Sequence, residues 1–182
     1  MALTIDHIFA LYETKGGLTY GEDMSQVEHA LQCAECAKAD GAAESLIVAC
    51  LLHDIGHLFE DEAEVVEGLR DDRHEATGAA RLDALFGAAV SRPVALHVAA
   101  KRYLCAREPG YCDALSAASK ASLALQGGPF EAAQAARFET LPYWREAVQL
   151  RRYDDLGKVV GRALPDFASY RPIVERAARV AG

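Results

Sequence analysis

The sequence has no apolar run long enough to cross a membrane and no segment typical of a signal peptide. Its first residues, MALTIDHIFALYETKGG, contain no basic region, no long apolar stretch and no small-residue cleavage site. No segment elsewhere reaches the roughly 18 consecutive apolar residues that a membrane helix needs. We therefore expect a cytoplasmic protein that does not insert into a membrane.

Basic residues are also scarce. The chain has 19 Lys and Arg against 27 Asp and Glu, which gives a formal net charge of -8. Non-specific binding to nucleic acid or to an anionic membrane requires an excess of positive charge. We expect neither as a partner, and an anionic substrate would need a local cationic pocket.

Cysteine usage argues against a disulfide framework. Five Cys are an odd number in a chain without a secretory signal. Cys33 and Cys36 form a CxxC pair, but this pair lies in a helical pattern and no second pair follows it. We interpret both residues as small buried side chains rather than as a zinc or redox site.

Strand patterns are missing as well. Almost every segment has apolar residues at helical spacing, and no two alternating segments flank a hairpin turn. No internal repeat, low-complexity tract or linker divides the 182 residues, of which 51% are apolar. These features predict an all-α protein, a helical bundle in which residues 1–182 form a single domain.

Capping and breaking residues predict where the helices lie. Ser25 and Glu28 form a capping box, which starts a helix that we expect to run to about Asp40. The next helix carries IVACLLHDIGH, and Gly56 is expected to end or bend it. Ser91 is the expected cap of a later helix with a proline in its first turn. The remaining expected helices are RHEATGAARLDALF, CDALSAASKASLALQ, PFEAAQAARF, PYWREAVQLRRYDDLGKVVGRAL and a closing helix over about residues 166–180.

Five histidines fall at or near helical faces, namely His29, His53, His57, His74 and His97. A buried carboxylate next to a buried imidazole, as in the doublet His53-Asp54, is costly unless a cation compensates it. Imidazole and carboxylate together suit zinc, iron or manganese, and Asp54 has two oxygens that could bridge two ions. A further carboxylate is available in RRYDDLGK, at either Asp154 or Asp155.

An early His, the His-Asp doublet and a distant Asp, in this order, resemble the HD-domain superfamily, whose members are mostly metal-dependent phosphohydrolases. The additional histidines resemble a smaller group of di-iron oxygenases within that superfamily. The segments YGEDMSQVEHAL, HVAAKRYL, SAASKASLALQGGPF and LRRYDDLGKV are similar to its phosphonate-cleaving members. The resemblance covers residues 19–160 and implies an HD-domain fold.

This resemblance implies a ligand set for two iron ions in a mixed-valent Fe2+/Fe3+ pair. One iron would be held by His29, His53, Asp54 and Asp154, and Asp54 would bridge to a second iron held by His74 and His97. Asp154 is preferred to Asp155 because it stands three residues after Arg151 and four before Lys158, as in the family pattern.

Polar residues beside these presumed ligands fit a phosphonate cradle made of Lys101, Ser119, Ser122 and Arg151. Lys101 follows His97 by one helical turn, and Arg151 precedes Asp154 by nearly one turn, so both cations would border the metals. By the resemblance, His57 would contact the substrate. Tyr20 and Glu22 would gate the second iron, and the family carries its tyrosine one residue earlier, where this chain has Thr19.

The resemblance implies that the protein uses O2 to cleave the carbon–phosphorus bond of a 1-hydroxy-2-(substituted amino)ethylphosphonate. The products would be phosphate and either glycine or glycine betaine, so the nitrogen substituent stays open. No Gly-rich dinucleotide or flavin motif is present, in keeping with a reaction that consumes no external reductant. The alternative is a metal-dependent HD phosphohydrolase acting on a nucleotide or another phosphate ester, and a third hypothesis is a non-catalytic HD module.

Overall fold

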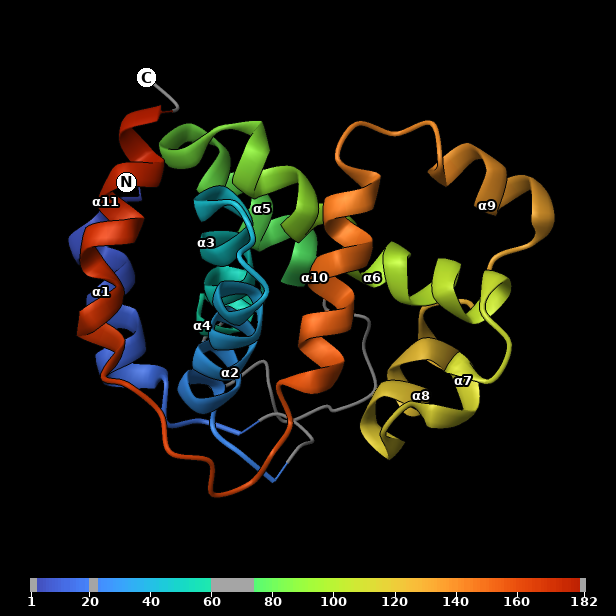
Figure 1. Ribbon diagram of the computed structural model, residues 1–182, viewed down its shortest axis with the longest axis horizontal. Coiled ribbons are helices and arrows are strands. Elements are labelled where there is room, and N and C mark those ends of the chain that lie inside the picture. Colours follow the sequence, from blue (N-terminus) through green and yellow to red (C-terminus); the bar gives the residue numbers. More distant parts are fainter. Residues whose placement is uncertain (1–2, 20–22, 60–73, 181–182) are drawn as a thin grey trace.

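The computed structural model describes residues 3–19, 23–59 and 74–180, and within these ranges every regular element is a helix (Figure 1). No strand occurs in them, so the predicted all-α class is confirmed. In chain order the elements are α1 (Ile5–Lys15), α2 (Gln26–Ala39), α3 (Glu44–Leu52), α4 (Ile55–Leu58), α5 (His74–Phe86), α6 (Ala88–Arg107), α7 (Tyr111–Ala114), α8 (Ala117–Leu125), α9 (Ala132–Phe138), α10 (Trp144–Leu156), the short 3-10 helix η1 (Phe167–Tyr170) and α11 (Arg171–Val180).

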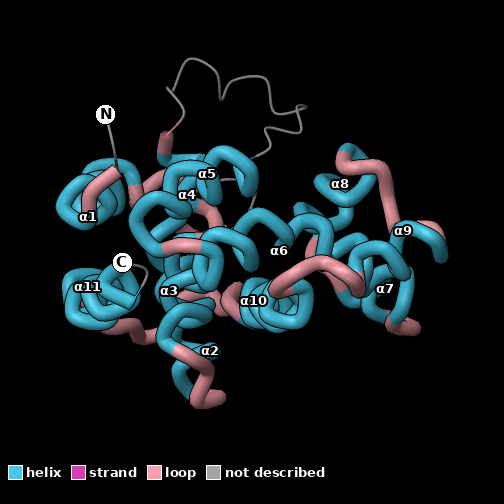
Figure 2. Tube along the Cα trace, turned by 90° about the horizontal axis from the view of Figure 1, so that it is seen from above, coloured by secondary structure: helices cyan, strands magenta, loops and turns pink. Residues whose placement is uncertain are grey.

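Helix α3 forms the centre of the main core. Its sequence ESLIVACLL is apolar on all sides, and every residue from Leu46 to Leu52 is buried, as expected for a helix that other elements enclose. Helices α2, α6, α10 and α11 pack against it. Both views place α1 and α11 together at one end of the molecule (Figure 1 and Figure 2). The residues that follow α3 therefore begin deep inside the bundle.

Helix α6 connects this core to a smaller second one. Val90 and Val94 near its start belong to the main core, whereas Ala100 packs with Phe138 of α9 and Ala147 of α10 in a separate buried cluster. Helices α7, α8 and α9 gather around the far part of α6, at the end opposite α1 and α11 (Figure 2). Helix α6 therefore carries side chains from the core toward α8.

Helix α2 begins as the capping box predicts. The hydroxyl of Ser25 accepts a hydrogen bond from the backbone N–H of Glu28, and the Glu28 carboxylate accepts one from the backbone N–H of Ser25. The helix ends at Ala39, with Asp40 as its C-cap. Near the other end of the chain, Asp166 caps η1, which leads into α11. These two boundaries confirm the predicted helices.

The prediction of one helix running through IVACLLHDIGH to Gly56 is wrong. Helix α3 ends at Leu52, His53 and Asp54 form a turn, and α4 starts at Ile55. Gly56 lies inside α4 and does not end a helix. It permits close packing instead, because a Cβ at this position would overlap the backbone of His74. The turn, rather than a continuous helix face, presents the His-Asp doublet.

The prediction that Ser91 caps a helix is also wrong. Helix α6 starts at Ala88, directly after Gly87, whose φ of 66° is a conformation that glycine adopts without strain. This glycine is the N-cap of α6, which has no side-chain cap hydrogen bond. Ser91 lies within the helix and donates a hydrogen bond to Asp83, and Pro93 lies beyond the first turn.

Two predicted helices are shorter than expected. The segment CDALSAASKASLALQ divides into α7 and α8 because the Ser116 side chain accepts the backbone N–H of Ser119 and starts a new helix. The predicted helix PYWREAVQLRRYDDLGKVVGRAL corresponds to α10, which ends at Leu156 with Gly157 as C-cap. A Cβ at Gly157 would lie 2.5 Å from the Sγ atom of Cys33. Close packing on α2 therefore fixes a glycine at the end of α10.

Two further expectations concern membrane-spanning helices and disulfide bonds. Within the described ranges, none of the helices combines the length and apolar character that crossing a bilayer requires. All five cysteines are free thiols, and the sequence predicts no disulfide framework.

Candidate metal centre and substrate cavity

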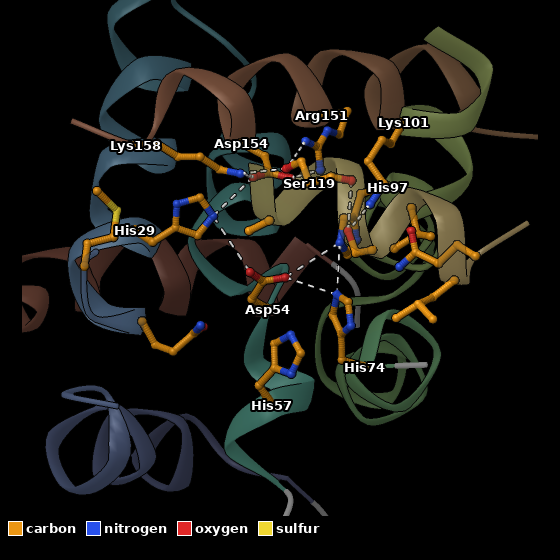
Figure 3. Close-up of a pocket in the computed structure, with 17 residues that line it drawn as sticks. His29, Asp54, His57, His74, His97, Lys101, Ser119, Arg151, Asp154 and Lys158 are labelled. Carbon is orange, nitrogen blue, oxygen red and sulfur yellow. Dashed lines mark hydrogen bonds and ion pairs between the residues drawn. The ribbon is translucent and has the colours of Figure 1, made fainter. Parts of the chain in front are cut away.

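Asp54 lies at the middle of a cluster of histidines, with a different pair facing each of its carboxylate oxygens (Figure 3). Its Oδ2 atom is 3.8 Å from Nε2 of His29 and 3.3 Å from Nε2 of His53. Its Oδ1 atom is 3.3 Å from Nε2 of His74 and 3.6 Å from Nε2 of His97. The carboxylate thus separates two half-sites, as a bridge between two metal ions would.

The orientation of the imidazoles follows from hydrogen bonds to the main chain. Three histidines donate from Nδ1 to a backbone carbonyl, which are His29 to Gly157 at 2.9 Å, His53 to Cys50 at 2.9 Å and His97 to Val94 at 2.7 Å. A carbonyl can only accept, so in each ring Nδ1 carries a proton and Nε2 turns inward. This is the usual arrangement behind metal-binding histidines.

The cluster fits metal cations. Nε2 of His53 is buried and has no hydrogen-bond partner, although it lies beside the Asp54 carboxylate. Nε2 of His74 and Nε2 of His97 are only 3.3 Å apart. Burial, followed by the nearby His53 and His74, lowers the pKa of His97 to about 3, so this ring is neutral and its lone pair is available. Such inward-facing lone pairs and a carboxylate are stable together when cations sit between them.

The two candidate aspartates of α10 have different surroundings. Oδ1 of Asp154 is 3.2 Å from Nε2 of His29, and the side chain is buried. Asp155 instead accepts hydrogen bonds from Arg151 and from the hydroxyl of Tyr111. The geometry therefore brings Asp154, and not Asp155, to the half-site of His29 and His53.

Cys33 is a competing ligand, although the sequence favours a small buried side chain over a metal site. Its thiol lies within ligand distance of His29 and His53, and its Sγ atom is 3.8 Å from both ring nitrogens of His29. Burial raises the pKa of the Cys33 thiol, which keeps it in the weakly ligating neutral form. The Asp154 carboxylate lies closer to Nε2 of His29, so we favour Asp154 as ligand and Cys33 as packing beneath Gly157.

A cavity of about 220 Å³ opens beside this cluster. All five residues expected to contact the substrate line it, namely His57, Lys101, Ser119, Ser122 and Arg151. The ring of His57 stacks on that of His74, with centroids 4.0 Å apart and planes at 20°. The two expected gating residues, Tyr20 and Glu22, lie outside the described residues.

Lys101 and Ser122 form one side of the cavity. The Lys101 ammonium is buried and donates to the Ser122 hydroxyl over 2.6 Å. Burial, and then repulsion by Arg151, lowers the pKa of Lys101 to about 8. A buried cation held by a neutral hydroxyl is well placed to receive an anion, because an arriving negative charge relieves both the desolvation and the repulsion.

Lys158 and Gln126 are among the cavity residues that the sequence pattern did not indicate. The ammonium of Lys158 donates to Ser119 over 3.0 Å and lies 3.7 Å from Oδ1 of Asp154. Gln126 follows Ser122 by one helical turn, lines the cavity, and has a buried Oε1 atom without a hydrogen-bond partner. The turn spacing from Ser122 was the available signal for Gln126, whereas Lys158 lies beyond the end of α10.

The chain resembles two phosphonate dioxygenases over nearly its whole length. It is 44% identical over 173 residues to hydroxymethylphosphonate dioxygenase of Gimesia maris, covering 94% of this chain and 86% of that protein. It is 39% identical over 174 residues to [1-hydroxy-2-(trimethylamino)ethyl]phosphonate dioxygenase (glycine-betaine-forming) of Leisingera caerulea, covering 94% and 89%.

A third relative, uncharacterized protein L432 of Acanthamoeba polyphaga mimivirus, is 32% identical over 174 residues, covering 93% of this chain and 80% of that protein. No protein-family model matches the chain. The two named relatives confirm the expectation of an oxygenase over the phosphohydrolase alternative. The chain belongs to the family of phosphonate dioxygenases.

Proposed function

We propose that the protein is a di-iron oxygenase that uses O2 to cleave the carbon–phosphorus bond of 2-amino-1-hydroxyethylphosphonate, releasing glycine and phosphate. The observation that carries this proposal is the two-sided environment of Asp54 directly beside a cationic cavity. The names of the two characterised relatives support a 1-hydroxyphosphonate as the substrate class.

The proposed ligands divide between the two oxygens of Asp54. One iron would be held by His29, His53, Asp54 and Asp154, and the other by Asp54, His74 and His97. Imidazole with carboxylate is a donor set that suits iron. When bound as a mixed-valent Fe2+/Fe3+ pair, the metals would supply the chelation of the substrate and the activation of dioxygen.

The overall reaction balances without an external reductant. In the substrate, C1 carries a hydroxyl, a hydrogen and the phosphonate. Breaking the C1–H and C1–P bonds oxidises C1 to a carboxylate, and one O2 molecule is reduced as its oxygen atoms enter the products. A 1-hydroxyphosphonate dianion and O2 thus give a carboxylate, hydrogen phosphate and one proton.

The cationic side of the cavity would bind the phosphonate. Lys101 and Lys158 each already donate to a serine hydroxyl, and a phosphonate oxygen can replace or join that acceptor. Ammonium groups bind such oxygens as point charges, and serine hydroxyls add neutral donors. Together they neutralise the dianion and hold C1 toward Asp54.

Three further residues that line the cavity would select the group attached to C1. They are Val98, Leu125 and Gln126, and the buried Oε1 atom of Gln126 has no hydrogen-bond donor. A primary ammonium group can supply that donor, whereas a trimethylammonium group has no N–H and a hydroxymethylphosphonate has nothing beyond C1. A buried acceptor left unsatisfied costs about 1–3 kcal/mol, so Gln126 favours the primary amine.

The test is to incubate the iron-loaded protein with O2 and each of three substrates, hydroxymethylphosphonate, 2-amino-1-hydroxyethylphosphonate and its N-trimethyl derivative. We expect phosphate and a matching carboxylate in equal amounts, fastest for the primary amine. Without O2, phosphate release should stop after residual oxygen is consumed. Equal release with and without O2 would overturn the proposal, and so would a protein that binds iron but cleaves none of the three.

A further inference from the structure

Arg151 of α10 is held from several sides. Its Nη1 atom donates to Oδ2 of Asp154 over 2.5 Å, and its Nε atom donates to the hydroxyl of Tyr111 over 3.2 Å. Its Nη2 atom donates to the hydroxyl of Ser119 over 3.3 Å and also to the carboxylate of Asp155. The guanidinium therefore connects a proposed metal ligand, the cavity wall and two residues behind the cavity.

These contacts use most of what a guanidinium can offer. Arginine has five N–H donors, and the four bonds just named leave one N–H, on Nη1, for a further acceptor among the residues that the structure describes. Arg151 lines the cavity, and this remaining donor could bind a substrate oxygen without giving up any of the four bonds. The orientation of the guanidinium therefore determines whether this N–H reaches a phosphonate oxygen.

Tyr111 and Asp155 close a ring of hydrogen bonds with Arg151. The hydroxyl of Tyr111 accepts from Nε of Arg151 and itself donates to the Asp155 carboxylate, which in turn accepts from Nη2 of Arg151. Burial raises the pKa of Tyr111 well above its ordinary value, so the hydroxyl keeps its proton. Each of these three side chains restrains the other two. The ring of hydrogen bonds satisfies the buried guanidinium without using its remaining Nη1 donor.

Neither Tyr111 nor Asp155 lines the cavity, so neither can act on the substrate directly. We infer that Tyr111 and Asp155 are positioning residues, which orient Arg151 so that its free Nη1 donor faces the phosphonate and its other Nη1 donor steadies Asp154. This inference rests on the proposed function for the identity of the anion. It also gives Asp155 a role distinct from that of its neighbour Asp154.

The test compares Tyr111→Phe and Asp155→Asn with the parent protein, using steady-state kinetics, iron content and thermal unfolding. Tyr111→Phe removes only a hydroxyl, so it should raise KM for the hydroxyphosphonate about 3- to 10-fold and leave kcat and iron content unchanged. Asp155→Asn should raise KM by about 10-fold or more, because a charged partner is lost. Tyr170→Phe is a matched control, since it removes a tyrosine–carboxylate bond to Glu35 elsewhere in the fold.

Coupling to Arg151 separates positioning from a general structural role. In an Arg151→Lys background the planar guanidinium is absent, so adding Tyr111→Phe should produce no further rise in KM. Asp155→Glu, which keeps the charge, should recover part of the affinity. An additive effect of Tyr111→Phe in the Arg151→Lys background, or loss of iron with unchanged KM, would overturn the inference.

A binding measurement keeps this inference separate from the proposed reaction. Calorimetric titration of the iron-loaded protein with hydroxymethylphosphonate under argon needs no turnover. If the parent binds this anion but cleaves no hydroxyphosphonate, the proposed function fails while a weaker titration of Tyr111→Phe still supports the positioning role. Equal affinity in the parent, Tyr111→Phe and Asp155→Asn would contradict that role even if the reaction is as proposed.

Discussion

Gly56 of α4 lies directly against the backbone of His74 at the start of α5. A Cβ at position 56 would lie 2.1 Å from the carbonyl oxygen of His74 and 2.8 Å from its Cα atom. The two helices can approach this closely only because residue 56 has no side chain. The contact brings His74 to Asp54, which stands two residues before Gly56.

Gly56→Ala should therefore destabilise the protein and disturb one half of the metal centre. We expect a loss of about 1–3 kcal/mol in the free energy of unfolding, because the neighbour is backbone and cannot rotate away. Iron content should fall as His74 moves from Asp54. Gly17→Ala is the control, since a Cβ at Gly17 meets nothing within 4 Å. Equal melting temperatures and iron contents for the two variants would contradict the importance of the contact.

Substituting the carboxylates one at a time should reveal which of them bind metal. Asp54→Ala removes the proposed bridge, so most of the iron should be lost, and activity should fall by at least about 100-fold. His53→Ala and Asp154→Ala should each weaken iron binding through loss of a terminal ligand. Asp155→Asn should keep its iron. Elemental analysis of the purified variants decides this, and full iron occupancy in Asp54→Ala would rule out the bridge.

The activity should depend on pH through Lys101. The ammonium is present below its pKa of about 8 and is lost above it, so kcat/KM should decline as pH rises through that value. The groups around it are Arg151 and Lys158, which lower the pKa, and Asp154 and Asp155, which raise it.

Lys101→Met should remove that decline and lower kcat/KM by about 10-fold near pH 7, because the phosphonate loses one ionic contact. Iron content should not change, since an ammonium ion is not a ligand. Lys120→Met, which alters an exposed lysine of α8, should retain the parent profile. The same decline in Lys101→Met as in the parent would assign the titration to another group.

Gln126→Met tests the proposed contact between Gln126 and the C1 substituent. Methionine keeps the length of the side chain but removes the amide oxygen. We expect kcat/KM for 2-amino-1-hydroxyethylphosphonate to fall about 10-fold and that for hydroxymethylphosphonate to change by less than about twofold. Equal losses for both substrates would mean that Gln126 contacts the phosphonate rather than the substituent.

The sequence predicts the helical class and the order of the site residues, because apolar spacing and histidine position are local properties. It does not predict where the helices end at Leu52 and Leu156, since the decisive contacts are tertiary. Gly157, for example, is needed because Cys33 lies 2.5 Å from where its Cβ would be, and no local pattern connects residues so far apart in the chain.

Helical spacing also limits which site residues can be predicted from the sequence. Asp154 and Asp155 are adjacent on a helix and point about 100° apart, so spacing alone could favour one but not show what each faces. In the structure, Asp154 lies next to His29 and Asp155 accepts a hydrogen bond from Tyr111. Lys158 was overlooked because it lies just beyond the end of α10, where helical spacing no longer describes the direction of a side chain.

The hydrogen bond from His29 to the carbonyl of Gly157 spans 128 residues of chain, and this separation has a consequence for biosynthesis. While the chain is being made, the four inward-facing histidines leave the ribosome before α10 does. An ion captured at that stage meets neither Asp154 nor the carbonyl that orients His29. Docking of α10 would thus complete the proposed centre, and a bound ion would then close a long loop between the early and late parts of the chain. Amide hydrogens of α10 should exchange faster once a chelator has removed the metal.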